Sequence, residues 1–190
     1  MNKYIFASSN QNKLLEISTQ LLDIRLLSLL DVGYYDEIIE SGSTLRENAL
    51  IKSKTIYDKY SIPTIADDTG LEVYQLDGRP GVFSARYSGE KANATDNIKK
   101  VLDEMQGITD RRARFKTVIC LKSKSQEIFF EGIVEGCISN ESSGDGGFGY
   151  DPIFIPNGCQ KTFGEMSLDE KNKISHRSRA IQKVVDYLNI

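Results

Sequence analysis

The sequence predicts an α/β protein, and three observations carry this prediction. A short apolar segment typical of a buried strand, residues 4–7, leads directly into a segment of helical periodicity. Two long runs, 113–122 and 127–139, alternate apolar and polar side chains as an antiparallel hairpin does. The charged tail from Ser167 onward has the apolar spacing of a helix. Because no linker, repeat or low-complexity tract divides these segments, we expect residues 1–190 to form one domain, or two lobes that share a cleft.

Charge and composition argue against several classes of protein. Acidic residues outnumber basic ones by 27 to 24, so no general positive field attracts nucleic acid or an anionic membrane surface. The cysteines, Cys120, Cys137 and Cys159, are an odd number without Cys-x-x-Cys spacing, which argues against a disulfide framework and a structural zinc site. No segment has the apolar length of a membrane span or a signal peptide. We therefore expect a cytoplasmic protein that binds neither nucleic acid nor membrane.

The first strand meets the first helix through small polar residues. Tyr4–Ala7 predicts the strand, Ser8–Asn10 interrupts it, and Lys13–Leu22 has the helical pattern. The predicted buried stripe of this helix is Leu14, Ile17, Leu21 and Leu22. Backbone N–H groups at such a junction bind anionic oxygens, and Lys13 adds a positive charge, so the junction is a candidate phosphate site. The alternative is an ordinary N-cap followed by a surface lysine.

An acidic, turn-rich segment separates this helix from the next. It covers residues 31–43 and contains Glu40. Thr44 and Glu47 then have the spacing of a capping box, which predicts a helix that extends to about Tyr60.

A strand at 64–66 is predicted to lead into the sequence Asp67-Asp68-Thr69-Gly70-Leu71. Adjacent side chains of a strand point to opposite faces, so at most one of these two carboxylates faces a given site. Asp68 is a candidate to ligate magnesium or to hold a water molecule. The alternative is an Asx-type turn before the glycine.

The middle of the chain predicts regular structure around one open question. Residues 72–76 predict a further strand, Asp77-Gly78 a tight turn and residues 93–107 a helix. Arg86 lies between small and aromatic residues, where it could reach a phosphate or lock its loop against the core.

The stretch Gly144–Pro152 is the most unusual part of the chain. Its glycines allow positive φ angles and a close approach of the backbone to a ligand or another surface. Phe148 and Tyr150 supply two flat faces and Asp151 a carboxylate, which predicts a cradle for a flat polar ring. A dinucleotide-binding glycine motif is rejected, because that motif must open a helix and here Tyr-Asp-Pro follows at once. The alternative is a mobile hairpin loop.

The C-terminal tail is predicted to be helical, and it contains Lys171, His176 and Arg177. Its predicted buried stripe is Ile174, Ile181, Val184, Val185 and Leu188. His176 is the only histidine, so a multi-histidine metal site is excluded. Taken alone, a histidine beside an arginine on a charged helix indicates solvated surface.

The individual motifs occur in an order that resembles the inosine triphosphate pyrophosphatase family. The matching segments are Ser8-x-Asn10-x-x-Lys13, Glu40, Asp67-Asp68-Thr69-Gly70-Leu71, Pro80-Gly81-x-x-Ser84-Ala85-Arg86-Tyr87, Gly147-Phe148-Gly149-Tyr150-Asp151-Pro152, and Lys171 with Ser175-His176-Arg177. The resemblance extends from residue 4 to residue 188, and it departs from the family at Thr69, where serine is common. It implies hydrolysis of non-standard purine nucleoside triphosphates such as ITP, dITP and XTP to the monophosphate and pyrophosphate. It also implies an elongated α/β fold of two lobes around a long central mixed sheet, with the nucleotide in the cleft between the lobes, and a homodimer.

The resemblance further implies roles for individual residues. The catalytic residues would be Asp68, as general base for the attacking water, and Lys13. Glu40 and Asp68 would hold Mg²⁺, a hard cation that takes one or two carboxylates together with phosphate oxygens. Phe148 would stack on the purine. The full set of substrate-binding residues would be Ser8, Ser9, Asn10, Gln11, Asn12, Lys13, Thr69, Phe148, Gly149, Tyr150, Asp151, Lys171, His176 and Arg177.

Base selection follows from donor and acceptor chemistry. Donors on His176 and Arg177 would select a 6-oxo purine over adenine, which presents an amino donor at that position. How GTP is excluded does not follow from the sequence. Further metal ligands stay open among Asp67, Glu47 and Glu72. Two rival functions also stay open: a nucleotide pyrophosphatase of different base specificity, and a non-catalytic nucleotide sensor, against which the presence of Glu40 with Asp68 counts.

Overall fold

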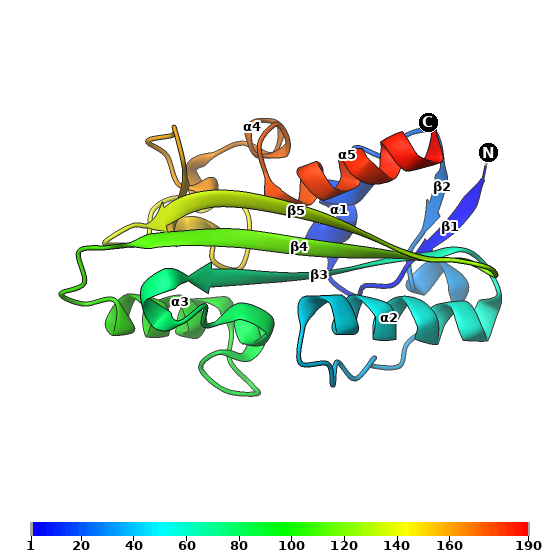
Figure 1. The fold of residues 1–190 in the computed structure, drawn as a ribbon, viewed down its shortest axis with the longest axis horizontal. Coiled ribbons are helices and arrows are strands. Elements are labelled where there is room, and N and C mark those ends of the chain that lie inside the picture. Colours follow the sequence, from blue (N-terminus) through cyan, green and yellow to red (C-terminus); the bar gives the residue numbers. More distant parts are fainter. Residues whose placement is uncertain (1, 190) are drawn as a thin grey trace. The chain divides into compact units, whose positions relative to one another are not determined.

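A computed structural model describes residues 2–189 and contains one six-stranded sheet in the order β2-β1-β3-β4-β5-β6 (Figure 1). The strands are β1 Lys3–Phe6, β2 Arg25–Leu27, β3 Thr64–Val73, β4 Arg112–Lys122, β5 Glu127–Ile138 and β6 Phe154–Pro156. The helices are α1 Gln11–Ser18, α2 Leu45–Tyr60, α3 Ala94–Glu104, α4 Leu168–Asn172 and α5 His176–Leu188. Strand β1 pairs in parallel with β2 and β3, whereas β5 pairs antiparallel with β6. The sheet is therefore mixed, and the predicted α/β class is confirmed.

The chain divides into two compact units. The first consists of Met1–Asp68, Thr117–Gly132 and Arg177–Ile190, and the second of Thr69–Lys116 and Ile133–His176. Strands β3, β4 and β5 each contribute residues to both units. Among the described residues, no helix is long and apolar enough to cross a membrane.

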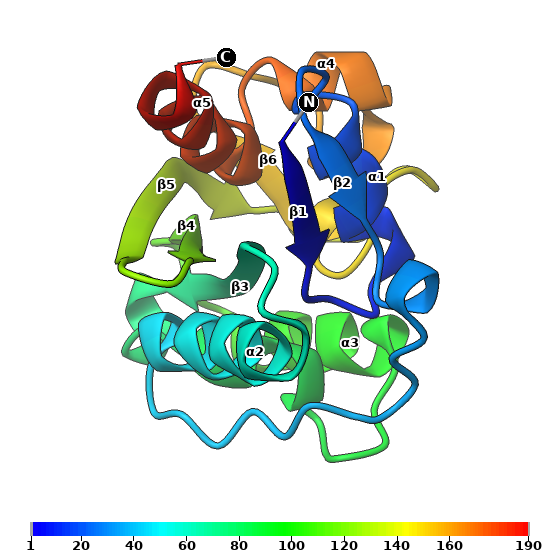
Figure 2. The same cartoon turned by 90° about the vertical axis from the view of Figure 1, so that its right-hand side faces the viewer.

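In the first unit the strands are covered on both faces. Phe6 of β1 packs in one cluster with Ile17 of α1 and Ile181 of α5. Its neighbour Ile5 packs in another cluster with Ile56 of α2. Figure 2 shows α2 and α5 on opposite sides of β3. This alternation of contacts is what a strand buried on both faces requires, and it explains why β1 has an apolar residue at nearly every position.

In the second unit the core forms around the ends of the long strands. Helix α3 contributes Val101 and its C-cap Met105 follows, and Phe115 of β4 packs against Phe154 and Phe163 in the same cluster. The ring centroids of Phe115 and Phe154 lie 4.7 Å apart in an edge-to-face arrangement. The same cluster includes Tyr150, which ties the end of the glycine-rich stretch to this core.

Strand β3 differs from the prediction. It runs without interruption through Asp67 and Asp68, so the Asx-type turn considered there is wrong, and so is a separate strand at 72–76. Residues Tyr74–Leu76 form a 3₁₀ turn, after which Asp77 and Gly78 have positive φ as the predicted tight turn requires. The low strand propensity of aspartate is overridden here, because both carboxylates have cationic partners.

Helix boundaries also differ from the periodicity. Helix α1 ends at Ser18 rather than Leu22, and Leu22 is 71% exposed instead of buried. The C-terminal tail forms two helices rather than one, since α4 ends at Asn172 and α5 begins at His176. Ile174 lies in the break and packs on the second unit's core, which explains why it fitted a continuous apolar stripe.

The predicted capping box at α2 is confirmed only in part. The Thr44 side chain accepts a hydrogen bond from the Glu47 N–H at 3.1 Å. The Glu47 carboxylate, however, accepts from the N–H and hydroxyl of Ser43 rather than from the N-cap backbone.

Candidate active site

The junction between β1 and α1 is a capped helix N-terminus. The Asn10 side chain accepts hydrogen bonds from the N–H groups of Asn12 and Lys13, and the Asn10 N–H donates to the Ser8 hydroxyl at 3.2 Å. Asn10 is thus an N-cap, as in the alternative of an ordinary N-cap followed by a surface lysine. The second half of that alternative is wrong, because the Lys13 ammonium lies 3.2 Å from the Asp67 carboxylate and the Lys13 side chain is only 14% exposed.

Asp67 and Asp68 point to opposite faces of β3, as predicted for neighbours in a strand. Asp67 is fully buried and contacts Lys13 and Arg177. Asp68 contacts Lys52 and Asn48 instead. Burial alone would raise the pKa of Asp67, but the charges of Lys13 and Arg177 outweigh it and hold that pKa well below its ordinary value.

Glu40 and Asp68 converge on a single ammonium group. Lys52 of α2 lies 3.0 Å from a Glu40 oxygen and 3.3 Å from an Asp68 oxygen. Burial would lower the pKa of Lys52, but these carboxylates outweigh it and raise the pKa above its ordinary value, so the side chain stays cationic at neutral pH. Two carboxylates from distant segments that meet at one cationic point fit a hard cation that completes its shell with phosphate oxygens. No group of three or more His, Cys, Asp or Glu side chains within residues 2–189 could hold a metal by itself.

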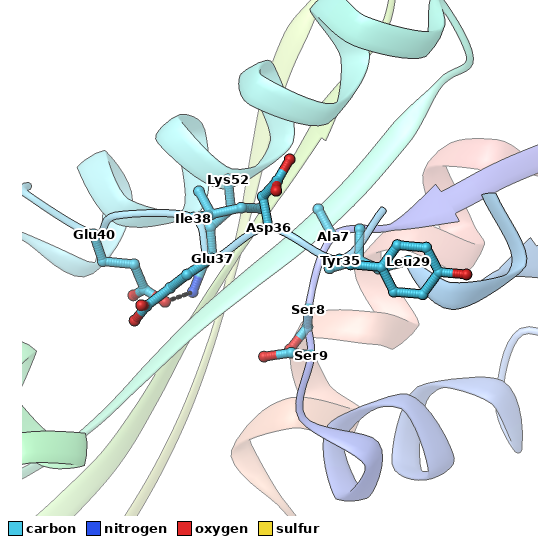
Figure 3. Close-up of a pocket in the computed structure, with 10 residues that line it drawn as sticks. All are labelled: Ala7, Ser8, Ser9, Leu29, Tyr35, Asp36, Glu37, Ile38, Glu40 and Lys52. Atoms are coloured by element: carbon cyan, nitrogen blue, oxygen red, sulfur yellow. Dashed lines mark ion pairs between the residues drawn. The ribbon is translucent and has the colours of Figure 1, made fainter. Parts of the chain in front are cut away.

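A pocket of about 380 Å³ lies beside this carboxylate pair. Its lining includes Ser8 and Ser9 of the strand-to-helix junction together with Glu40 and Lys52. Figure 3 shows the ion pair between Glu40 and Lys52 and the two serines, all drawn as lining residues of the same pocket. The first unit therefore brings together the predicted phosphate-binding junction and one predicted metal ligand.

Arg177 lies in a buried charge network of the first unit. Its guanidinium donates to Asp67 from Nε and Nη2 and to Glu16 from Nη1, and the side chain is 1% exposed. Burial would lower the pKa of Arg177, but Asp67 and Glu16 outweigh it and raise the pKa. The solvated-surface interpretation of this residue is wrong. These contacts join Arg177 to the carboxylate that also holds Lys13.

Three residues of the first unit were not recognised in the sequence: Glu16, Asn48 and Lys52. Glu16 precedes the buried Ile17 on α1, and Asn48 and Lys52 are four residues apart on α2 within its buried face. A polar side chain at a position that helical periodicity assigns to the core is a signal that could have found them.

The glycine-rich loop of the second unit is held by close backbone packing. Gly144 and Gly147 have φ angles of +83° and +68°. A Cβ at Gly144 would lie 2.2 Å from the backbone of Gly164, and one at Gly147 would lie 2.2 Å from the Asp151 carboxylate. The Gly146 N–H also donates to the Gly164 carbonyl at 2.8 Å. These contacts tie the loop to Gly164 and Asp151, which favours the cradle over the alternative of a mobile hairpin loop.

Phe148, Asp151 and Lys171 form one group at the end of this loop. The Asp151 carboxylate accepts from the Phe148 N–H at 2.7 Å and from the Lys171 ammonium. The ammonium lies 4.7 Å from the centre of the half-buried Phe148 ring, within the range of a cation–π contact. These contacts hold the Phe148 backbone and place the Lys171 ammonium over its ring.

Tyr150 and His176 occupy the core rather than the surface. The Tyr150 ring belongs to the core cluster of the second unit, and its hydroxyl donates to the Ser84 carbonyl at 2.8 Å. The prediction that Tyr150 supplies a second flat face for a bound ring is therefore wrong. Burial raises the pKa of Tyr150 well above its ordinary value. His176 is 2% exposed and stacks on Phe115 with ring centroids 4.5 Å apart, which contradicts the solvated-surface interpretation.

Comparison with known proteins agrees with these motifs. The chain matches the model of the Ham1 family over residues 4–187, which is nearly its whole length. This chain belongs to the Ham1 family. It is 48% identical over 184 residues to a Flavobacterium psychrophilum protein named dITP/XTP pyrophosphatase, covering 96% of this chain and 97% of that protein. A Porphyromonas gingivalis protein of the same name is 45% identical over 190 residues, covering 99% and 98%.

Solved structures of Ham1 proteins share the fold. The Staphylococcus aureus Ham1 protein superposes with a TM-score of 0.90 at 37% identity, covering 99% of this chain and 98% of that one. A HAM1 protein from Coxiella burnetii gives a TM-score of 0.91 at 37% identity, covering 100% and 99%. These matches confirm both the α/β fold with a mixed sheet and the family inferred from the sequence.

Proposed function

We propose that this Ham1 protein is a dITP/XTP pyrophosphatase that hydrolyses non-standard purine nucleoside triphosphates to the monophosphate and pyrophosphate. The observation that carries the proposal is the convergence of Glu40 and Asp68 on one cationic point beside a pocket lined by Ser8 and Ser9. Relatives of 42–48% identity that bear the name dITP/XTP pyrophosphatase support the same substrate class.

In this proposal the first unit binds the triphosphate. The backbone N–H groups of Ser9 and Gln11, the Ser8 hydroxyl and the Lys13 ammonium would contact phosphate oxygens, as helix N-termini do with anions, while the N–H groups of Asn10 and Asn12 donate within the cap. Asp67 holds Lys13 in place through their ion pair. Burial lowers the pKa of Lys13 below its ordinary value, and the charge of Asp67 opposes that shift. Lys52, kept cationic by its two carboxylate partners, would offset charge on the same phosphates.

Glu40 and Asp68 would hold Mg²⁺ together with phosphate oxygens. Bound there, Mg²⁺ would neutralise phosphate charge and polarise the phosphoanhydride. Asp68 would also accept the proton of the attacking water as general base, a role that requires a direct hydrogen bond to that water.

The second unit supplies residues for the base. Phe148 would stack on the purine, with Thr69 and Gly149 contributing polar backbone or hydroxyl groups. Lys171, through Asp151, keeps the Phe148 backbone in position. His176 would donate toward the 6-oxo group that distinguishes hypoxanthine and xanthine from adenine.

We further propose that the protein is a cytoplasmic homodimer and that its partner besides the second copy is the nucleotide.

The proposed reaction can be tested by incubating the protein with dITP, XTP, dATP, dGTP and dCTP in the presence of Mg²⁺ and measuring pyrophosphate and orthophosphate separately. We expect pyrophosphate and monophosphate from dITP and XTP. Orthophosphate as the first product would contradict the position of cleavage. A preference for dCTP would assign a different base specificity, and binding without turnover would leave a nucleotide sensor.

A further inference from the structure

We infer that Asn48 is a positioning residue, whose amide sets the orientation of the Asp68 carboxylate and ties it to the segment that carries Glu40. Its kinetic consequences rest on the proposed function, whereas the orientation of Asp68 does not.

The Asn48 amide uses both of its ends. Asn48 lies on α2 and is fully buried. Its Nδ2 donates to Asp68 Oδ2 at 3.1 Å, and its Oδ1 accepts from the Gly42 N–H at 2.8 Å. A flipped amide would place an oxygen against the carboxylate and an NH₂ group against an N–H donor, so only one orientation satisfies both partners.

The two oxygens of Asp68 have partners of different kinds. Oδ1 lies 3.3 Å from the ammonium of Lys52, which is a flexible cation. A metal ion bound at Oδ1 would share this oxygen with Lys52 or replace Lys52 there. Oδ2 accepts from the neutral Asn48, whose bond does not depend on which cation is present. Asp68 therefore has one contact that a bound cation can replace, with Lys52, and one that stays whichever cation is bound, with Asn48.

Asn48 also fixes the segment that precedes α2. A Cβ at Gly42 would lie 2.6 Å from Asn48 Oδ1 and 2.7 Å from the Glu47 Cβ, so this segment packs directly against the amide. Glu40 is two residues upstream of Gly42, its side chain is one-third exposed, and it forms an ion pair with Lys52. One buried amide thus sets the separation of two carboxylates that come from different parts of the sequence.

Groups of this kind, which orient ligands without touching the reacting atoms, typically change metal affinity or activity by 10- to 100-fold when removed. We expect Asn48→Ala to lower kcat for dITP by about 10- to 100-fold and to raise the Mg²⁺ concentration for half-maximal rate by a similar factor. KM for dITP should change much less than kcat, because the phosphate contacts of the β1–α1 junction stay intact.

Asn97→Ala is the matched control. Asn97 is 4% exposed on α3, accepts from the Ser88 N–H at 2.8 Å and donates to the Ala85 carbonyl at 3.1 Å, so the same truncation removes the same kinds of bond. Its partners in these two bonds are a backbone N–H and a backbone carbonyl, whereas Asn48 donates to a carboxylate. We expect Asn97→Ala to lose stability like Asn48→Ala but to keep its kcat and its Mg²⁺ dependence.

Gly42→Ala is a second variant, used if Asn48→Ala does not fold. It leaves Asn48, Asp68 and Glu40 chemically unchanged but forces the amide to move, and it should reproduce the loss of kcat. A third measurement does not involve activity: the crystal structure of whichever variant folds should show Asp68 in a different rotamer or displaced. If the wild-type protein does not hydrolyse dITP, the proposed function fails while this structural readout still decides the inference. A folded variant with Asp68 in place, and with wild-type kcat where activity exists, would overturn it.

Discussion

The Arg177 guanidinium donates from Nε and Nη2 to a single oxygen of Asp67, at 3.2 and 3.1 Å. The Lys13 ammonium lies 3.2 Å from the same oxygen. Glu16 accepts from the remaining edge of the guanidinium. Arg177, which the sequence analysis assigned to the purine edge, is thereby connected through Asp67 to Lys13, which it assigned to the phosphates. We therefore expect a change at Arg177 to affect the turnover of every nucleotide.

Arg177→Lys keeps the positive charge but cannot bond two carboxylates as a planar fork does. We expect kcat/KM to fall by about 10²-fold for dITP and for dATP alike, because a small displacement of Asp67 and Lys13 acts on the shared phosphates. Steady-state kinetics on both nucleotides measures this, with circular dichroism to verify folding. A fall confined to dITP would instead mean that Arg177 contacts the base.

His176→Phe should change selectivity rather than turnover in general. The substituted ring can keep the stack on Phe115 but has no N–H donor. We expect a higher KM for dITP and a ratio of kcat/KM between dITP and dATP that narrows by about tenfold or more, since a site that bonds a polar group discriminates strongly against an analogue without it. If the folded variant keeps the wild-type ratio, base selection resides at another residue.

Asp68→Asn should reduce kcat by at least ~10²-fold while the fold survives, because the amide keeps the shape but cannot accept a proton. Rapid-quench measurement of a single turnover separates this effect from product release. An active Asp68→Asn enzyme would assign the general base elsewhere, with Glu72 the next candidate, because Asp67 is held by Lys13 and Arg177 on the other face of β3.

Asp67 should contribute stability that depends on pH. Its folded-state pKa lies below the unfolded value of ~3.9, so the ionised carboxylate stabilises the fold above that pH, and the contribution is lost as the pH falls toward the folded-state pKa. We expect Asp67→Asn to be less stable by about 3–5 kcal/mol at pH 7, because it leaves Lys13 and Arg177 without their shared anion. Urea denaturation from about pH 7 to about pH 3 measures the free energy of unfolding of both proteins. The difference between wild type and Asp67→Asn should shrink only at the acidic end of this range. A difference that is constant across the range would mean that Asp67 acts through packing and not through its charge.

The sequence predicted the elements with strong periodicity and the motifs with unusual composition. Strand β1, the existence of helix α3 and the positions of β4 and β5 follow from local patterns, and the structure confirms them, although α3 ends at Glu104 rather than at the predicted Gly107. The continuous strand β3 could not be predicted, because the pairing of Asp67 and Asp68 with cations distant in sequence overrides their local preference for a turn.

Some site residues could likewise be predicted from local motifs, and others could not. Glu40 and Asp68 could be named from motifs, but Lys52, which joins them, lies in the middle of an ordinary helix. Tyr150 was misplaced because an aromatic residue next to glycines fits a binding loop and a core equally well from sequence alone. Long-range contacts decided each of these cases, and no local pattern encodes them.

The register of β3 against β1 has a further consequence for how this chain tolerates insertions. The pairs Ile5↔Thr64 and Phe6↔Ile65 fix which side of the sheet each following residue faces. Adding or deleting one residue between Ile65 and Asp67 would exchange the two aspartates, presenting the former partner of Lys13 to Lys52 and the reverse. Both carboxylates would still be present, but each would face the partners of the other. Relatives with length changes should therefore carry them outside this short interval, in the turns that precede Thr64 or follow Val73.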